Sequence, residues 1–230
     1  VTKYGEENIT YAEVDGRKMA AYVNGEGEHT IVLLSSYRDV CPTVTLKPLA
    51  DTLAENYKGR GLSTPPVTGK PALVYFIDRL LTFSQSPVKG NILLVHNVAI
   101  NQESIDYAKK HLETPFFAIC PLSNIFIHRA LPPLDLMREN GLQICLGTDS
   151  LSSNTILSMA KEIVCLHRNF PHIELEEILQ WACLNGARML GKDDVLGSFE
   201  PGKKPGAVLV ENLDWENMKF TDDTVTRRII

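Results

Sequence analysis

Three short apolar runs, each flanked by segments with helical periodicity, constrain the fold of this chain most. The runs cover residues 91–96, 115–120 and 142–146. Helical spacing of apolar residues is expected over about 71–83, 104–111, 134–140, 156–168 and 175–190. Buried strands that alternate with helices are typical of βα units in a parallel sheet. The sequence therefore predicts an α/β fold in which helices cover parallel strands.

The two ends of the chain have a different pattern. Residues 9–14 and 18–23 alternate between apolar and polar around Asp15-Gly16, which predicts a β-hairpin. At the other end, residues 207–210 and 224–230 have the composition of short strands. We expect a small accessory β element built from both termini.

A Gly- and Pro-rich segment at residues 58–66 separates two parts of the chain. Before it, residues 30–34 form an apolar run that suits a buried strand, and residues 46–57 have helical spacing. The expected organisation is a first unit, a junction, a βα segment and accessory strands, over 1–57, 58–66, 67–196 and 197–230. Four buried parallel strands are too few to close a barrel, so we expect a half-barrel or an open sheet.

Composition excludes several classes of function. The formal net charge is -5 with no basic block, which argues against a nucleic-acid partner. No apolar run reaches the roughly 18 residues needed to span a membrane, and the first eight residues resemble no signal peptide. The five cysteines are scattered without a Cys-x-x-Cys pair, and three lie in apolar stretches, as buried free thiols do. These features predict a reduced, cytoplasmic setting.

Polar residues follow all three predicted strands, where parallel α/β folds place their functional groups. His96 ends the first strand, Ser123 and Asn124 follow the second, and Asp149 follows the third. His96 alone would be a strand cap, and Asp149 alone would be a helix N-cap. At neighbouring strand ends, however, the two together suit a metal site or a general acid–base pair.

Five motifs in fixed order carry a family resemblance. They are Leu94-Val-His-Asn97, Cys120-Pro-Leu-Ser-Asn124, Leu146-Gly-Thr-Asp-Ser150 with Ser153-Asn154, Leu184-Asn-Gly-Ala187 and Gly197-Ser-Phe-Glu-Pro-Gly-Lys203. From about residue 61 to residue 230, the sequence resembles the C-terminal half of the amidohydrolase superfamily. The branch that it resembles contains chlorohydrolases and deaminases of adenosine and S-adenosylhomocysteine. Pro205-Gly206 departs from the family pattern at a turn.

The resemblance implies a (β/α)8 barrel with an accessory β-sandwich and a bound zinc ion that activates water. It also implies that Asp149 is a metal ligand that takes a proton from the water, and that His96 faces the attacked group or the metal-bound water. Ser123, Asn124 and Asn154 would line the substrate site. The segments around Asn185 and from residue 197 to 203 are structural in the family.

The histidines of this chain depart from the family pattern. The family's first strand supplies a His-x-His pair, and its fifth strand supplies another His followed by a Glu. The chain contains His29, His96, His111, His128, His167 and His172. No two have His-x-His spacing, and one aspartate with one imidazole cannot replace three or four zinc ligands. We therefore expect that zinc is not retained and that the chain alone is catalytically silent.

The other histidines have simpler interpretations. His167 and His172 are expected on the surface near the end of a helix, where a cation favours the helix dipole. His111 is expected to end a helix in the same way. His128 is expected in a loop, facing solvent or touching a substrate.

The first 57 residues resemble a different family, the α/β-hydrolases, in their opening strands and first helix. No Gly-x-Ser-x-Gly nucleophile elbow occurs, which excludes a serine hydrolase made by this chain alone. The two resemblances together suggest a chimeric polypeptide. Exposed sheet edges in such a fold predict a homodimer.

Two other functions stay open. A partner chain could complete an amidohydrolase-type site that acts on C–N bonds of a purine- or pyrimidine-like substrate. Alternatively, the strand ends around His96 and Asp149 could bind a small heterocycle without catalysis.

Overall fold

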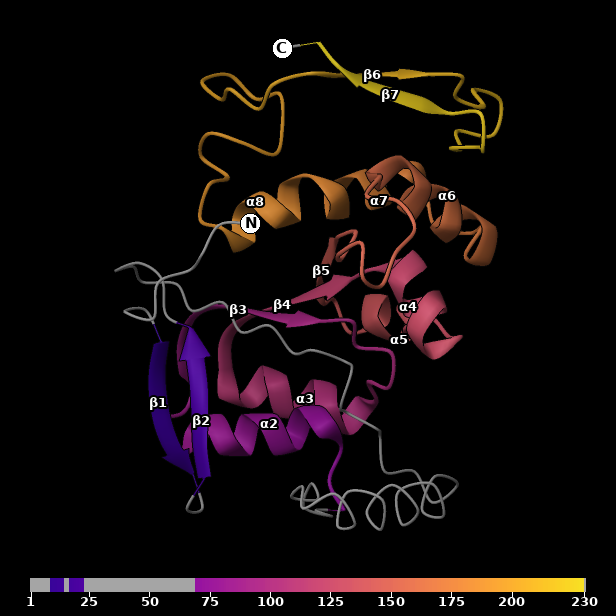
Figure 1. The fold of residues 1–230 in the computed structure, drawn as a ribbon. Helices are drawn as coiled ribbons and strands as arrows, with labels where there is room; N and C mark the ends of the chain where they lie inside the picture. Colours follow the sequence, from indigo (N-terminus) through magenta and orange to yellow (C-terminus); the bar gives the residue numbers. More distant parts are fainter. Residues whose placement is uncertain (1–8, 15–16, 23–68, 230) are drawn as a thin grey trace.

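A computed structural model describes residues 9–14, 17–22 and 69–229 (Figure 1). The elements in chain order are β1 (Ile9–Val14), β2 (Arg17–Tyr22), α2 (Ala72–Leu81), β3 (Val88–Val95), α3 (Gln102–His111), β4 (Leu112–Ile119), α4 (Pro121–His128), α5 (Leu134–Glu139), β5 (Gln143–Leu146), α6 (Met159–Asn169), α7 (Leu175–Ala182), α8 (Leu184–Met189), β6 (Val208–Glu211) and β7 (Val225–Arg228). The strand at 30–34, the helix at 46–57 and the junction at 58–66 lie outside the described residues.

The predicted parallel sheet is confirmed. Its strands follow the order β3-β4-β5, and both pairs are parallel. In register, Phe117 pairs with Leu94 on one side and with Ile144 on the other. Helix α3 connects β3 to β4, and α4 and α5 connect β4 to β5, so all carboxyl ends of the strands lie at one edge.

Strand alternation divides the apolar side chains between the two faces of the sheet. Ile92, Phe117 and Ile144 belong to a large core that also includes buried side chains of α2, α3 and α5 to α7. A second, smaller cluster on the opposite face contains Phe116, Ala118, Cys145 and Met189. Helices α2, α3 and α5 to α7 thus pack on one face of the sheet, whereas Met189 of α8 belongs to the cluster on the other face.

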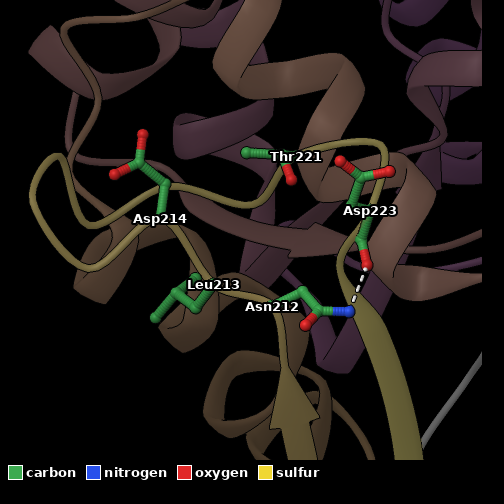
Figure 2. A pocket seen from close by; sticks show the side chains of 5 residues that line it. All are labelled: Asn212, Leu213, Asp214, Thr221 and Asp223. Carbon is green, nitrogen blue, oxygen red and sulfur yellow. Dashed lines mark hydrogen bonds between the residues drawn. The ribbon is translucent and has the colours of Figure 1, made fainter.

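The hairpin predicted near the N-terminus and the strands predicted near the C-terminus are also present, as two separate two-stranded antiparallel sheets. β1 pairs with β2, and β6 pairs with β7. The segment between β6 and β7 forms a pocket lined by Asn212, Leu213, Asp214, Thr221 and Asp223 (Figure 2). This segment is bound to α6 by hydrogen bonds to residues 220 and 222, so the accessory strands are fixed to the helical layer.

Three local expectations were wrong. Residues 121–128 form a helix, so His128 ends α4 instead of lying in a loop. The expected helix at 175–190 is interrupted at Cys183, whose φ of -123° is not helical. His167 is buried, not on the surface, because it faces Phe220 of the accessory segment, whose N–H donates to His167 Nδ1 at 3.1 Å. Sequence periodicity does not report such contacts between distant segments.

One other expectation is confirmed within the described residues. Cys120, Cys145 and Cys165 are buried free thiols. None of the described helices is long and apolar enough to cross a membrane.

Candidate functional site

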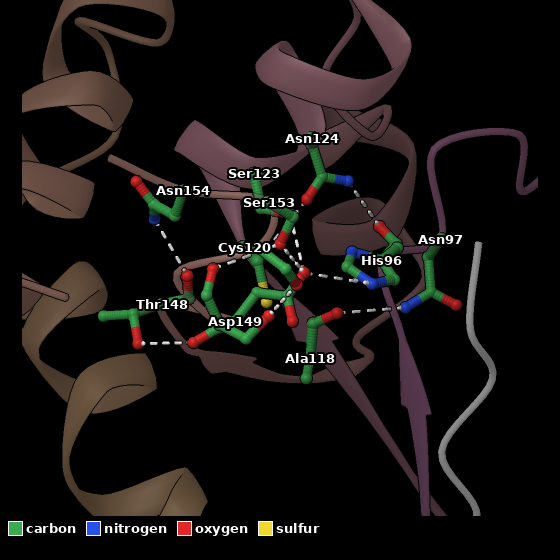
Figure 3. A network of polar contacts seen from close by, with 12 residues as sticks. His96, Asn97, Ala118, Cys120, Ser123, Asn124, Thr148, Asp149, Ser153 and Asn154 are labelled. Atoms are coloured by element: carbon green, nitrogen blue, oxygen red, sulfur yellow. Dashed lines mark hydrogen bonds and ion pairs between the residues drawn. The ribbon is translucent and has the colours of Figure 1, made fainter. Parts of the chain in front are cut away.

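The candidate site lies where β3, β4 and β5 end (Figure 3). Backbone pairing continues one residue past two of these strands, since His96 N–H donates to Ala118 O at 2.8 Å and Gly147 N–H donates to Ile119 O at 2.9 Å. The polar residues after each strand are therefore fixed by the sheet itself. The predicted convergence of His96 and Asp149 is what the structure shows.

Backbone conformations at this edge are unusual. His96, Asn97 and Asp149 have φ values of 73°, 56° and 57°, in the left-handed region that residues with a side chain rarely adopt. Asn97 is held there by its own side chain, whose Nδ2 donates to Leu94 O at 2.9 Å. Conformations of this kind cost free energy and concentrate at functional sites, where the surrounding structure maintains them.

Asp149 is held by two serine hydroxyls. Its Oδ2 accepts hydrogen bonds from Ser123 Oγ at 2.7 Å and from Ser153 Oγ at 2.5 Å. Burial raises the pKa of Asp149, but the hydrogen bonds from Ser153 and Ser123 and the nearby His96 together hold it below its usual value. The carboxylate is therefore ionised at neutral pH, as a proton acceptor must be.

His96 lies against this carboxylate. Its Nε2 is 3.8 Å from Asp149 Oδ2, and the residue is only 7% exposed. Its Nδ1 is buried without a hydrogen-bond partner among the described residues. A buried imidazole nitrogen without a partner is costly, and a ligand or water molecule can satisfy it.

His128 joins this environment from the end of α4. Its Nε2 is likewise buried and without a described partner. Burial lowers the pKa of His128, and His96 lowers it further. His128 is therefore neutral at physiological pH and can accept or donate one hydrogen bond through Nε2.

The two asparagines expected at the substrate site are buried and bound to the protein. Asn124 accepts from Cys120 N–H at 3.2 Å and donates to His96 O at 3.3 Å. Asn154 donates to Thr148 O at 2.8 Å. Both therefore brace the loops of the site, and their contact with a substrate stays a prediction.

Two residues of the site were given no role by the sequence. Ser153 donates a hydrogen bond to Asp149, and Glu162 of α6 is fully buried. Glu162 accepts from Leu122 N–H at 2.9 Å and from Asn154 Nδ2 at 2.8 Å. One sequence signal could have shown Glu162: it is an acidic residue three positions after Met159 and four before Leu166, on the apolar stripe of a helix.

The described residues do not fit a zinc ion by themselves. No group of three or more His, Cys, Asp and Glu side chains in this part of the chain could hold a metal. Asp149 Oδ2 is already bound by two hydroxyls, and a zinc site takes three or four protein ligands. Asp149 and His96 can supply at most two of these ligands, and the others have no source among the residues that the structure describes.

The fold and the polar residues at the carboxyl edge of the sheet together define the class of protein. Parallel βα units with a histidine and an aspartate at the carboxyl edge correspond to one side of a (β/α)8-type barrel. Residues 78–230 match the amidohydrolase family, and the chain belongs to that family.

Similar proteins agree with this assignment. A 5-methylthioadenosine/S-adenosylhomocysteine deaminase of Thermoanaerobacter pseudethanolicus is 31% identical over 123 residues, which are 50% of this chain and 28% of that protein. The structure of Helicobacter pylori aminofutalosine deaminase has a TM-score of 0.54 at 25% identity, covering 67% of this chain and 37% of that one. An adenosine deaminase from Xanthomonas campestris, solved with bound zinc, shares the fold with a TM-score of 0.51 at 22% identity, covering 72% of this chain and 39% of that one. The aligned part thus spans well under half of each relative.

Proposed function

We propose that this chain contributes the β3–β5 edge of an amidohydrolase-type site that hydrolyses a C–N bond of a purine- or pyrimidine-like substrate. The observation that carries the proposal is the Asp149 carboxylate, held by two hydroxyls and 3.8 Å from His96 Nε2. Family membership supports the reaction type, and the deaminases among the relatives support the substrate class.

In the proposed reaction, water adds to the carbon that bears the amino group, and the C–N bond then breaks. Asp149 accepts the proton that the water loses and returns it to the departing nitrogen, which leaves as ammonia. His96 faces the reacting group and donates or accepts one hydrogen bond there. The orientation of Asp149 depends on Ser123 and Ser153, which occupy Oδ2.

The source of further metal ligands is part of the proposal. The sequence has no His-x-His pair, and the described residues hold no metal cluster. We propose that a second polypeptide supplies these ligands and that this chain alone is silent. We also propose a chimeric origin, because residues 1–57 precede the family match and resemble the α/β-hydrolases in sequence.

Complementation tests the proposal. The chain is assayed for ammonia release from adenosine, guanine and cytosine, alone and with the part of the Thermoanaerobacter pseudethanolicus relative that lies outside the matched segment. We expect release only from the mixture, and its loss in Asp149→Asn. Asp106→Asn, at an exposed position in α3, is the matched control and should keep the activity.

Two results would contradict this account. Stoichiometric, tightly bound zinc together with activity in the chain alone would show that no second polypeptide is needed. Ammonia release that survives Asp149→Asn would remove Asp149 from the reaction.

The Nδ1 of His96, which is buried without a partner among the described residues, favours a second candidate, a binding module for small heterocycles. Such a module needs no metal, and its ligand would stabilise it increasingly as the ligand concentration exceeds the Kd. Thermal-shift measurements with purines and pyrimidines on the chain alone test it. Stabilisation that is lost in His96→Ala, without any ammonia release from the complemented chain, would favour binding over catalysis.

A further inference from the structure

Glu162 is a buried carboxylate that the proposed reaction does not use. It is 0% exposed, and burial raises its pKa to about 7, while the Leu122 N–H and the Asn154 amide act in the opposite direction. Burying a group that ionises costs free energy unless hydrogen bonds compensate. A fold retains such a group more readily when its bonds perform a task.

The first bond of Glu162 fixes the start of α4. Cys120 occupies the N-cap position, but its side chain makes no capping hydrogen bond. Pro121, at the first helical position, has no N–H. The Leu122 N–H is one of the helix's orphan donors, and Glu162 Oε2 accepts it at 2.9 Å. Glu162 thereby replaces the missing cap. The next residue, Ser123, donates to Asp149.

The second bond fixes the loop between β5 and α6. Glu162 Oε1 accepts from Asn154 Nδ2 at 2.8 Å, and the same Nδ2 donates to Thr148 O at 2.8 Å. The loop is therefore closed across its base from residue 148 to residue 154. The residue before Asn154 is Ser153, the second hydroxyl donor to Asp149.

We propose that Glu162 is a positioning residue for Asp149, because its two oxygens fix the two backbone segments that carry Ser123 and Ser153. Each oxygen binds a residue adjacent in sequence to one of the two serines. Both hydroxyls reach Asp149 Oδ2, so a shift of either segment turns the carboxylate. The inference rests on the proposed function only in treating Asp149 as the reacting group.

Two variants separate hydrogen bonding from packing. Glu162→Gln keeps the shape and one acceptor, but its NH2 group opposes the Asn154 amide, whereas Glu162→Met fills the space and accepts nothing. Glu176→Gln, at an exposed position in the next helix, is the matched control. Amide hydrogen exchange and the amide chemical shifts of Leu122, Asp149 and Ser153 are measured by NMR in the full chain.

In Glu162→Met, we expect exchange at Leu122 to accelerate by about tenfold or more, as for a lost hydrogen bond to a charged acceptor. We also expect the amide shifts of Asp149 and Ser153 to move. Glu162→Gln should restore much of the Leu122 protection but not the Ser153 shift. Wild-type exchange and shifts in Glu162→Met would overturn the proposal, because packing alone would then suffice.

A measurement on the wild type keeps the proposal testable if the variants do not fold. Scalar coupling across the hydrogen bonds should link the Leu122 backbone nitrogen and the Asn154 side-chain nitrogen to Glu162 Cδ. Absence of both couplings would overturn the proposal. None of these readouts uses activity. If the complemented chain releases no ammonia while these readouts are still observed, the proposed function is refuted and Glu162 remains a positioning residue.

Discussion

Substitution of Gly197 by alanine should destabilise the chain through two separable causes. Gly197 has a φ of +87°, which disfavours any residue with a Cβ. A Cβ placed there would lie 2.8 Å from Ala187 Cβ and 2.9 Å from Leu184 Cα, both in helix α8. Because one of these atoms belongs to the backbone, the contact cannot be relieved by a change of rotamer.

The expected cost follows from the two causes. Left-handed backbone costs a residue with a side chain about 1 to 2 kcal/mol. Overpacking against atoms that cannot move adds about 1 to 3 kcal/mol, which makes a total of roughly 2 to 5 kcal/mol. For a chain of this length, each kcal/mol lowers the melting temperature by about 2 to 4 °C, so we expect a decrease of about 4 to 20 °C.

Thermal unfolding of three variants, followed by circular dichroism, tests this reasoning. Gly202 also has a positive φ, +94°, but an added Cβ meets no atom within 4 Å, so Gly202→Ala should cost the backbone contribution alone. Gly186 lies in α8 with open space around it, so Gly186→Ala should be neutral or stabilise by up to about 1 kcal/mol. Equal losses in Gly197→Ala and Gly202→Ala would show that the contact with α8 contributes nothing.

Three further predictions concern the site and its surroundings. Ser123→Ala and Ser153→Ala should each raise the pKa of Asp149, because each removes a hydrogen bond to the ionised form; an unchanged carbon-13 titration of the carboxyl group would refute this. Burial, and then Lys219, lowers the pKa of His167 below 6.5, so its contribution to the free energy of unfolding is complete at pH 8 and declines as the pH falls below about 6.5. Urea unfolding should show that decline in the wild type and a smaller decline in His167→Ala. The variant should also lose about 1 to 3 kcal/mol of unfolding free energy, because the Phe220 N–H loses its acceptor. Parallel curves of unfolding free energy against pH would contradict this account of His167. A chelator should leave the melting temperature of the chain alone unchanged, since the described residues hold no metal cluster; a decrease would show a bound ion.

The local pattern of apolar and polar residues was sufficient to predict most of the described helices and strands. The apolar runs at 91–96, 115–120 and 142–146 became β3, β4 and β5, because burial on both faces leaves an unbroken apolar signal. Helix α4 was missed because its eight residues are too few to show helical periodicity. The parallel order also followed from the sequence, since helices occupy the connections.

The candidate site was predictable only in part. His96, Ser123 and Asp149 could be placed at one edge because parallel strands end together. That Ser153 turns back to Asp149, and that His167 is buried by Phe220, depends on loop paths that have no periodic signal. Glu162 is 40 residues from Leu122, so their bond could not be inferred from spacing.

The sequence by itself determined the class of fold, the strand ends that carry polar groups, and the lack of a His-x-His pair. These properties depend on local composition and on the geometry common to all parallel βα units. Only the tertiary structure decided which donors reach Asp149, and that a buried carboxylate on α6 joins the two segments that carry them. Such contacts depend on the directions of single side chains across the fold, and the packing of the whole domain sets those directions.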